Sequence, residues 1–237
     1  MAKKSVDLTT LSGWANLSGG NHTIKIVAKG TGYSDSEKSA GVEVFKEYTD
    51  CLTFTGIDSE FTLTATNTQW RGTLEWSTDH INWSEFRKVL GQPVTIQSLD
   101  KKLYLRGKNN NRGFYREYEG VEFVLSAKAY CKGNIQTLID WENPPSFIPT
   151  SNFYQNMFYG CTNLISAPEL PATTLSNYCY YFMFSGCTKL KVNSVSGNKI
   201  FDCPSTIPTD AVTNMFRNTG GEFTGTPTAG NTYYYTV

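Results

Sequence analysis

Two neighbouring stretches of this chain share one motif: "NFYQNMFYGCTNLISAPELPATTL" at residues 152–175 and "NYCYYFMFSGCTKL" at residues 177–190. The shared pattern is M-F-x-G-C-T-x-L, so that Met157 of the first copy corresponds to Met183 of the second. Self-similarity at a short period predicts a stacked architecture, because a single copy has nothing against which to bury its apolar face. A third, degenerate copy follows in "VTNMFRNTGG" at residues 212–221.

The local pattern within each copy predicts a brief helix followed by an extended leg. Apolar residues recur at i, i+3, i+4 and i+7, which is the spacing of one helix face. A glycine then stands where a helix ends in the left-handed conformation, and the prolines of "APELPATTL" exclude further helix in the leg. We expect the core of this stack to contain Met157, Phe158, Leu164, Met183, Phe184 and Leu190.

Before the repeat, residues 48–130 have the pattern of a β-sandwich. Six short segments alternate in hydrophobicity between turns rich in Gly, Asp and Asn: "CLTFTGI", "EFTLTATN", "GTLEWSTD", "PVTIQSL", "KLYLRGK" and "VEFVLSA". A polar and aromatic loop, "KNNNRGFYREYEG" at residues 108–120, separates the last two. Loops of this kind are either solvated or sites of contact.

Residues 1–47 contain only two clear strands, "TIKIVAK" and "GVEVF". This is too little for a complete immunoglobulin-like sandwich, and a two-stranded piece is marginal in water. We therefore expect this unit to dock on sister subunits or on a virion scaffold protein, with packing on its own middle module as the alternative. The candidate docking residues are Trp14, Ile24, Ile26, Val42 and Val44.

Together these patterns predict a mainly β, multi-module protein. Residues 1–47 would form a partial immunoglobulin- or fibronectin-like unit, residues 48–130 a β-sandwich, and residues 131–237 a short leucine-rich-repeat-type solenoid with brief helices and caps. The segment "GNIQTLIDWENPP" at residues 133–145 is the expected opening cap of the solenoid.

The repeat resembles that of BspA-like leucine-rich-repeat surface proteins of gut bacteria and their phages, in which M-F-x-G-C-x-x-L and A-P-x-L-P-A-T-T-L recur many times. The preceding β segments "LTFTGIDSEFTL" and "LEWSTDHINW" are similar to modules that come before such repeats. The chain departs from the family in having only two good copies. The resemblance implies binding, adhesion or surface display, and it supplies no catalytic residues.

Composition argues against several other functions. The 21 basic and 21 acidic residues give a net charge of zero, so no broad field attracts nucleic acid or an anionic membrane. Motifs for nucleotides or catalytic zinc are absent from the sequence, and we expect no enzyme activity, no cofactor and no metal. The carboxylate pairs Asp58/Glu60 and Asp140/Glu142 are interpreted as solvated turn acids. His22 and His80 are interpreted as exposed turn histidines rather than partners of a nucleophilic cysteine.

The six cysteines lack C-x-x-C spacing, which argues against a zinc ribbon. Three of them fall at or beside the repeat motif, and this favours small buried thiols that serve packing. A disulfide between adjacent turns remains the alternative. The first residues, "MAKKSVDLTTLSGW", have a basic start without an apolar segment behind it, so no signal peptide is expected. A protein made in the reducing cytosol is expected to keep its thiols free.

Aromatic side chains give the best indication of a contact site, because tyrosine offers a large contact area at low entropic cost. The alternative for any one tyrosine is half-burial against a neighbour. The candidate partner-binding residues are Tyr159, Tyr178 and Tyr181 in the repeat and Tyr115 and Tyr118 in the long loop.

The leading functional hypothesis is a phage virion protein, such as a head fibre, decoration or tail-associated protein, that binds a cell-surface protein or glycan through its C-terminal module. The alternatives are a bacterial surface adhesin, or a phage inhibitor that binds a host defence protein in the cytoplasm. None of the three calls for membrane insertion.

Overall fold

The structure, a computed structural model, describes residues 20–24, 42–46, 51–66, 72–87, 92–109, 113–116 and 119–237. The chain divides into two compact units, Met1–Thr49 and Asp50–Val237. Antiparallel sheets dominate the described residues, and the mainly β prediction is confirmed.

In the first unit, β1 (Gly20–Ile24) pairs antiparallel with β2 (Val42–Lys46), and both strands overlap the predicted segments. Ile24 lies opposite Val42 and His22 opposite Val44 in the register. Trp14 and Ile26 lie outside the described residues. The predicted docking role of this unit stays a prediction.

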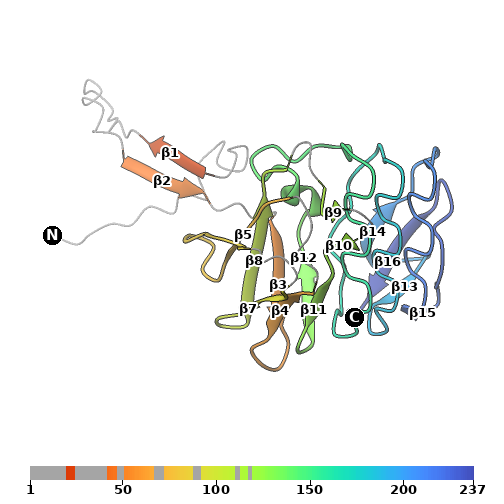
Figure 1. Cartoon of the computed structure of the whole chain (residues 1–237), viewed down its shortest axis with the longest axis horizontal. Coiled ribbons are helices and arrows are strands. Elements are labelled where there is room, and N and C mark those ends of the chain that lie inside the picture. The colour runs from red at the N-terminus through yellow and green to blue at the C-terminus, as the bar shows by residue number, and fades with distance from the viewer. Residues whose placement is uncertain are drawn as a thin grey trace, which may run out of the picture. The chain divides into compact units, whose positions relative to one another are not determined.

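The second unit begins with two antiparallel sheets (Figure 1). All six predicted segments contain strands. The first sheet has the order β12 (Ala129–Lys132), β3 (Leu52–Gly56), β8 (Lys102–Gly107), β5 (Leu74–Ser77), β6 (Ser84–Glu85). The second has the order β11 (Phe123–Leu125), β4 (Thr62–Ala65), β7 (Val94–Gln97). Strands such as β3 and β4 alternate buried with half-buried residues, because successive side chains of a strand point to opposite faces.

The long loop at residues 108–120 contains a small pair of strands, β9 (Tyr115–Arg116) and β10 (Glu119–Gly120). Phe114, immediately before β9 in the middle of the loop, is fully buried. This loop is therefore anchored to the core near its middle.

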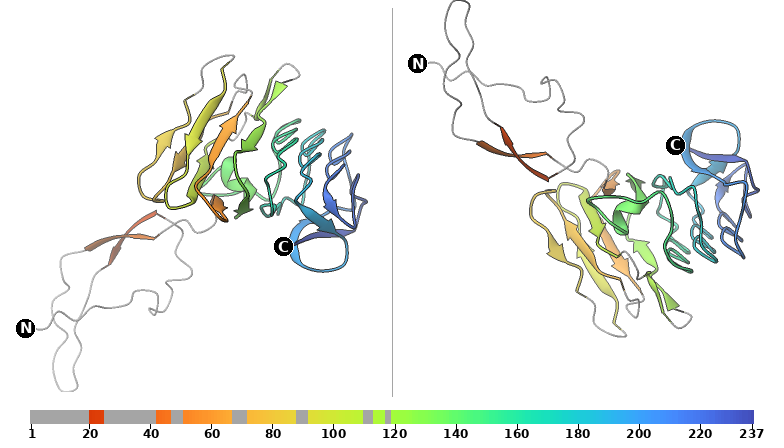
Figure 2. Two further views of the ribbon diagram at one scale, coloured as in Figure 1. Left: turned by 90° about the horizontal axis from the view of Figure 1, so that it is seen from below. Right: turned by 90° about the horizontal axis from the view of Figure 1, so that it is seen from above.

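The repeat forms three stacked coils, each with a turn segment of matching sequence: residues 152–161, 178–187 and 210–219. The backbone N–H groups of residues 152, 154, 156, 158 and 160 donate to carbonyls of the second coil at 2.8–3.0 Å. Residues 178, 180, 182, 184 and 186 donate in the same way to the third coil at 2.8–3.1 Å. Hydrogen bonds between coils thus use alternate residues, and the stack prediction agrees with this arrangement (Figures 1 and 2).

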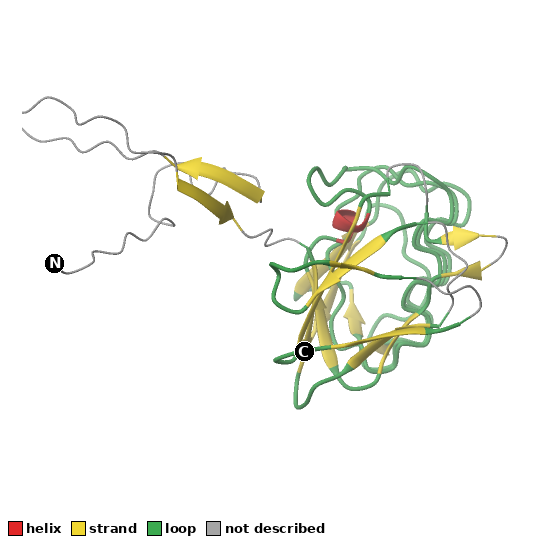
Figure 3. Ribbon diagram, turned by 60° about the vertical axis from the view of Figure 1, so that its left-hand side comes forward, coloured by secondary structure: helices red, strands yellow, loops and turns green. Residues whose placement is uncertain are grey.

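The prediction of brief helices in the turn segments is wrong. Every fourth residue has a positive φ, between 50° and 80°, and the residues between them close turns such as Met157 N–H to Tyr154 C=O. A helix keeps φ negative throughout. Inward residues nevertheless fall at i, i+3, i+4 and i+7, so the pattern of burial imitates a helix. Figure 3 shows the coils as turns and loops.

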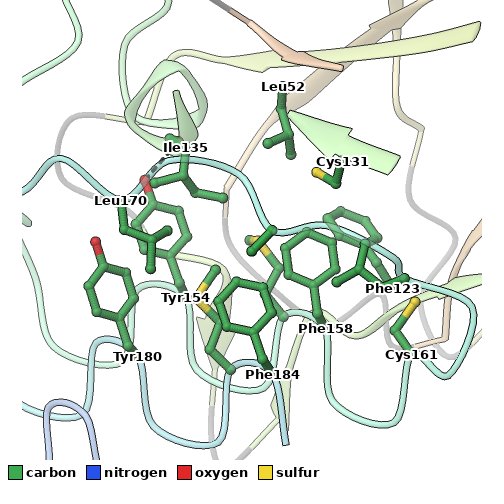
Figure 4. Packing of buried hydrophobic residues seen from close by; sticks show 14 of the residues in the cluster. Leu52, Phe123, Cys131, Ile135, Tyr154, Phe158, Cys161, Leu170, Tyr180 and Phe184 are labelled. Atoms are coloured by element: carbon green, nitrogen blue, oxygen red, sulfur yellow. Dashed lines mark hydrogen bonds between the residues drawn. The ribbon is translucent and has the colours of Figure 1, made fainter. Parts of the chain in front are cut away.

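Cores of the coils and of the sheets are continuous. The ring of Phe158 lies 6.0 Å from that of Phe123 in β11 and 5.5 Å from that of Phe184 in the next coil. The backbone joins the same parts, because Phe123 N–H donates to Met157 C=O and Ala129 N–H to Asn163 C=O. The sheets therefore close the first end of the stack, and residues 48–130 and 131–237 contribute to one hydrophobic cluster (Figure 4).

The expected opening cap also packs here. Residues Ile135–Leu138 form a buried 3-10 helix, η3, and the side chain of Asn134 accepts a hydrogen bond at its start. All six residues predicted for the core of the stack are fully buried.

A four-stranded sheet closes the other end of the stack, with the order β14 (Asn198–Asp202), β16 (Thr232–Thr236), β13 (Lys191–Asn193), β15 (Gly220–Gly221). The ring of Tyr233 lies 5.7 Å from that of Phe216 in the third coil, so the last apolar face is covered. None of the described helices is long and apolar enough to span a bilayer.

Candidate functional site

The outward side chains of the three turn segments form a surface that we call the coil face. Because coils are in register, equivalent residues lie in columns, and Asn152 is equivalent to Tyr178 and Asp210. Further columns are Gln155/Tyr181/Thr213, Asn156/Phe182/Asn214 and Tyr159/Ser185/Arg217, in which Gln155 and Ser185 are buried. Stacking thus converts a linear motif into a two-dimensional array of side chains.

Three of the predicted contact residues lie together on the coil face. The ring of Tyr159 lies 6.2 Å from that of Phe182, which lies 4.5 Å from Tyr181. Tyr181 in turn lies 5.7 Å from Tyr178. These four side chains form a continuous aromatic strip, in which Tyr159 is 47% exposed and the other three are half-buried. The motif alone does not single out Phe182, because this residue precedes Met183 and lies outside the shared M-F-x-G-C-T-x-L pattern.

The aromatic strip includes two unfavourable backbone conformations. Of the nine positive-φ positions in the turn segments, seven carry Gly, Asn or Asp, the residues that tolerate this conformation best. The two exceptions are Tyr178 at 57° and Phe182 at 53°. A bulky residue in this region costs on the order of 1 kcal/mol or more. Strain of this kind concentrates at functional sites, and here it coincides with the strip.

Polar side chains flank the strip on both sides. On the first coil, Asn152 donates a hydrogen bond of 2.5 Å to Gln155. On the third coil, Thr213 donates to Asp210 at 2.9 Å. The negative charge of Asp210 raises the pKa of the Tyr178 hydroxyl, so Tyr178 stays a neutral donor. The coil face therefore offers an apolar centre with hydrogen-bonding groups on each side.

The other candidate tyrosines are less informative. Tyr115 is a residue of β9 whose side chain is not among those described, and Tyr118 lies outside the described residues. Their predicted role in contact stays a prediction.

Three of the four acids interpreted as solvated turn acids form hydrogen bonds or ion pairs within the fold. Glu60 accepts hydrogen bonds from Ser98 and from the backbone of Lys101, and these lower the pKa of its carboxyl group. Asp140 and Glu142 both pair with Lys108, at 2.7 and 2.5 Å. Each of these acids therefore fastens a turn or joins two segments.

The interpretation of His80 as an exposed turn histidine is wrong. Its side chain is 6% exposed, and its Nε2 lies 3.0 Å from Sγ of Cys51, which is 1% exposed. The ring stacks on Tyr104 with 4.5 Å between centroids. A φ of 64° and a hydrogen bond from the His80 N–H to Ser77 Oγ turn the residue inward, which residue type alone does not reveal. The pair belongs to the packed interior.

All six cysteines are free and buried, in agreement with the packing interpretation. Burial raises the pKa of Cys161 to about 11 and that of Cys179 to about 12. It raises the pKa of Cys131 and Cys187 well above the ordinary value too. Since the thiolate is the reactive form, these thiols are unreactive at neutral pH.

Across the described residues, no group of three or more His, Cys, Asp or Glu side chains is placed to hold a metal ion. No protein-family model, no curated protein and no solved structure matches the chain. The coil face is accordingly the best-supported candidate site on the geometry of its own residues.

Proposed function

We propose that this chain is a non-enzymatic phage virion protein, such as a head fibre, decoration or tail-associated protein, that binds a surface carbohydrate through its coil face. The observation that carries the binding role is the aromatic strip, in which two aromatic residues occupy strained positions that the equivalent residues of the other coils fill with Asn or Asp. The virion location rests on the resemblance of the repeat to BspA-like surface and phage proteins.

The size of the strip favours a carbohydrate over a protein. Four aromatic side chains of about 200 Å² each, one 47% exposed and three half-buried, present on the order of 300 Å². A stable protein interface takes about 800 Å² from each partner. C–H groups on the face of a sugar ring pack on the negative face of an aromatic ring, and the flanking amides and carboxylate match sugar hydroxyls.

The rigidity of the coil face also supports a role in binding carbohydrate. The coil face is backed by fully buried Phe158 and Phe184 and tied by hydrogen bonds between coils. A preformed surface loses little conformational entropy on binding. Attachment to the particle is assigned to residues 1–47, because the edges of a two-stranded sheet favour pairing with another chain.

A glycan array probed with the labelled full chain tests the binding role. The wild-type chain should bind a defined set of neutral glycans, and the variant Tyr178→Asn/Phe182→Asn should lose that binding while it remains folded. Retained binding by this variant would remove the coil face as the site.

Mass spectrometry of purified particles tests the location. Detection of the chain in particles supports a virion protein. Recovery in a bacterial cell-wall fraction instead would indicate the adhesin, and recovery with one intracellular host protein would indicate the inhibitor.

A further inference from the structure

A second surface, lined by none of the residues of the aromatic strip, gathers positive charge. An open groove of about 450 Å³ lies between the first sheet, the coils and the C-terminal sheet. Three lysines line it, Lys128, Lys189 and Lys191, together with one acidic side chain, Asp58. Its other lining residues include Tyr130, Thr188 and Thr236.

These lysines come from two segments that are about 60 residues apart in the sequence. Lys128 precedes β12, Lys189 follows the second turn segment, and Lys191 begins β13. Backbone hydrogen bonds hold the walls: Ile57 N–H donates to Lys128 C=O at 3.1 Å, and Ile165 N–H to Ala129 C=O at 3.0 Å. Lys191 pairs with Thr236 in the C-terminal sheet. The groove is therefore built by tertiary structure and has fixed walls.

The charges of these three lysines are not neutralised within the described part of the chain. None of them forms an ion pair with a described residue, and Lys189 donates only to the neutral amide of Asn163, at 2.8 Å. Other lysines of the same unit do pair, Lys108 with two acids and Lys199 with Asp202. Three lysines without an ion-pair partner among the described residues thus line one groove, together with the acidic side chain of Asp58 and the C-terminal residue Val237.

Like charges that share a site repel one another, and an anion between them relieves this repulsion. Lysine ammonium groups donate charge-assisted hydrogen bonds to carboxylate, sulfate and phosphate oxygens. The exposed hydroxyl groups of Thr188 and Thr236 provide further donors, and the half-buried ring of Tyr130 provides an apolar wall. Lys132 adds a further charge 5.9 Å from the Tyr130 ring.

We propose that this groove is a binding site for a carbohydrate that carries oxyanion groups, namely carboxylate, sulfate or phosphate. This proposal does not depend on carbohydrate binding at the coil face. It rests on two observations: three lysines line the groove, and backbone hydrogen bonds hold the walls of the groove in place.

Calorimetric titration of the full chain tests the proposal with two probes, a galacturonic acid trimer and a heparin-derived tetrasaccharide. The first carries carboxylates only and the second carries sulfates as well, so their relative affinities identify the preferred oxyanion. Binding of at least one probe is expected, and it should weaken as salt is added, because exposed charges are screened. A neutral maltotriose should not bind at this groove.

The matched variants locate the site. Lys128→Gln/Lys189→Gln/Lys191→Gln should lower the affinity by at least about tenfold, whereas Lys199→Gln, which removes a paired lysine that does not line the groove, should not change it. Thr188→Glu, which adds a carboxylate and keeps every lysine, should weaken binding as well. Phe182→Asn should leave it unchanged, which separates this groove from the coil face. If neither probe binds, or if Lys199→Gln weakens binding as much as the triple variant, the proposal is overturned.

Discussion

The rings of Phe158 and Phe184 are parallel to within 2°, with 5.5 Å between their centroids. Phe216 continues the row at 5.8 Å and 9° from Phe184, and Phe123 of β11 begins it. Figure 4 shows Phe123, Phe158 and Phe184 side by side in the interior. One column of aromatic rings therefore runs from the first sheets through all three coils.

Removal of a ring from the middle of this column should be costly. Phe184→Ala leaves a cavity between two neighbours and should lower the free energy of unfolding by about 3–5 kcal/mol, as measured by urea denaturation. The control is Tyr159→Ala, which removes a 47% exposed ring and should cost far less. If Phe184→Ala unfolds at the wild-type urea concentration, the stacked core is not what stabilises this unit.

Two stacked tyrosines should respond differently to loss of the hydroxyl group. Tyr154 donates to Ile135 C=O and Gln136 Oε1 at 3.1 and 3.0 Å, whereas the buried Tyr180 hydroxyl has no hydrogen-bond partner among the described residues. Tyr154→Phe should cost about 1–3 kcal/mol, because it leaves buried acceptors unpaired. Tyr180→Phe should be neutral or stabilising in the same denaturation assay. The reverse order of the two effects would contradict this hydrogen-bond assignment.

The strained positions of the aromatic strip predict opposite effects on stability and binding. Phe182→Asn places a residue that tolerates positive φ at 53°, so the melting temperature should stay the same or rise. Glycan binding should fall, because the centre of the strip is lost. Asn218→Gly, at the positive-φ position that the other two coils fill with Gly160 and Gly186, is the control and should leave binding intact. A clear fall in melting temperature for Phe182→Asn would show that its ring serves the fold.

The buried thiols predict a loss of stability at alkaline pH. The folded state raises the pKa of Cys161 to about 11 and of Cys179 to about 12, from an ordinary value of 9.0. Their contribution is therefore fully present below pH ~9 and is lost as the pH rises through the folded-state values. Urea denaturation from neutral to alkaline pH measures this loss of stability, and Cys179→Ala should make the decline with pH less steep.

Thiol titration of the denatured, unreduced chain should find all six cysteines free.

Deletion of residues 1–47 separates attachment from binding. The remaining chain retains the complete hydrophobic cluster of the Asp50–Val237 unit, so it should fold as a monomer and keep glycan binding. It should no longer join particles or higher oligomers, as followed by sedimentation and particle assembly. Normal assembly of the truncated chain would place the attachment surface elsewhere.

The sequence by itself determined much of the fold. Alternating hydrophobicity located β3, β4, β5, β7, β8 and β11, and the doubled motif identified the stacked coils and their buried core, because these features depend on local periodicity. The sequence pattern did not distinguish a helix from the observed turn segments, because the same spacing of inward residues is expected for both structures. The positive φ at Tyr178 and Phe182 arises from hydrogen bonds between coils, which no local pattern contains.

The candidate sites divide in the same way. Composition indicated tyrosines of the repeat as contact residues, but only stacking placed Tyr159 of one coil against Phe182 of the next. The groove with Lys128, Lys189 and Lys191 could not be predicted from the sequence, because Lys128 meets the segment of Lys189 and Lys191 only after the sheets and coils share a core. The residue types determine which side-chain interactions are available, and long-range packing determines which of these side chains come together on the surface.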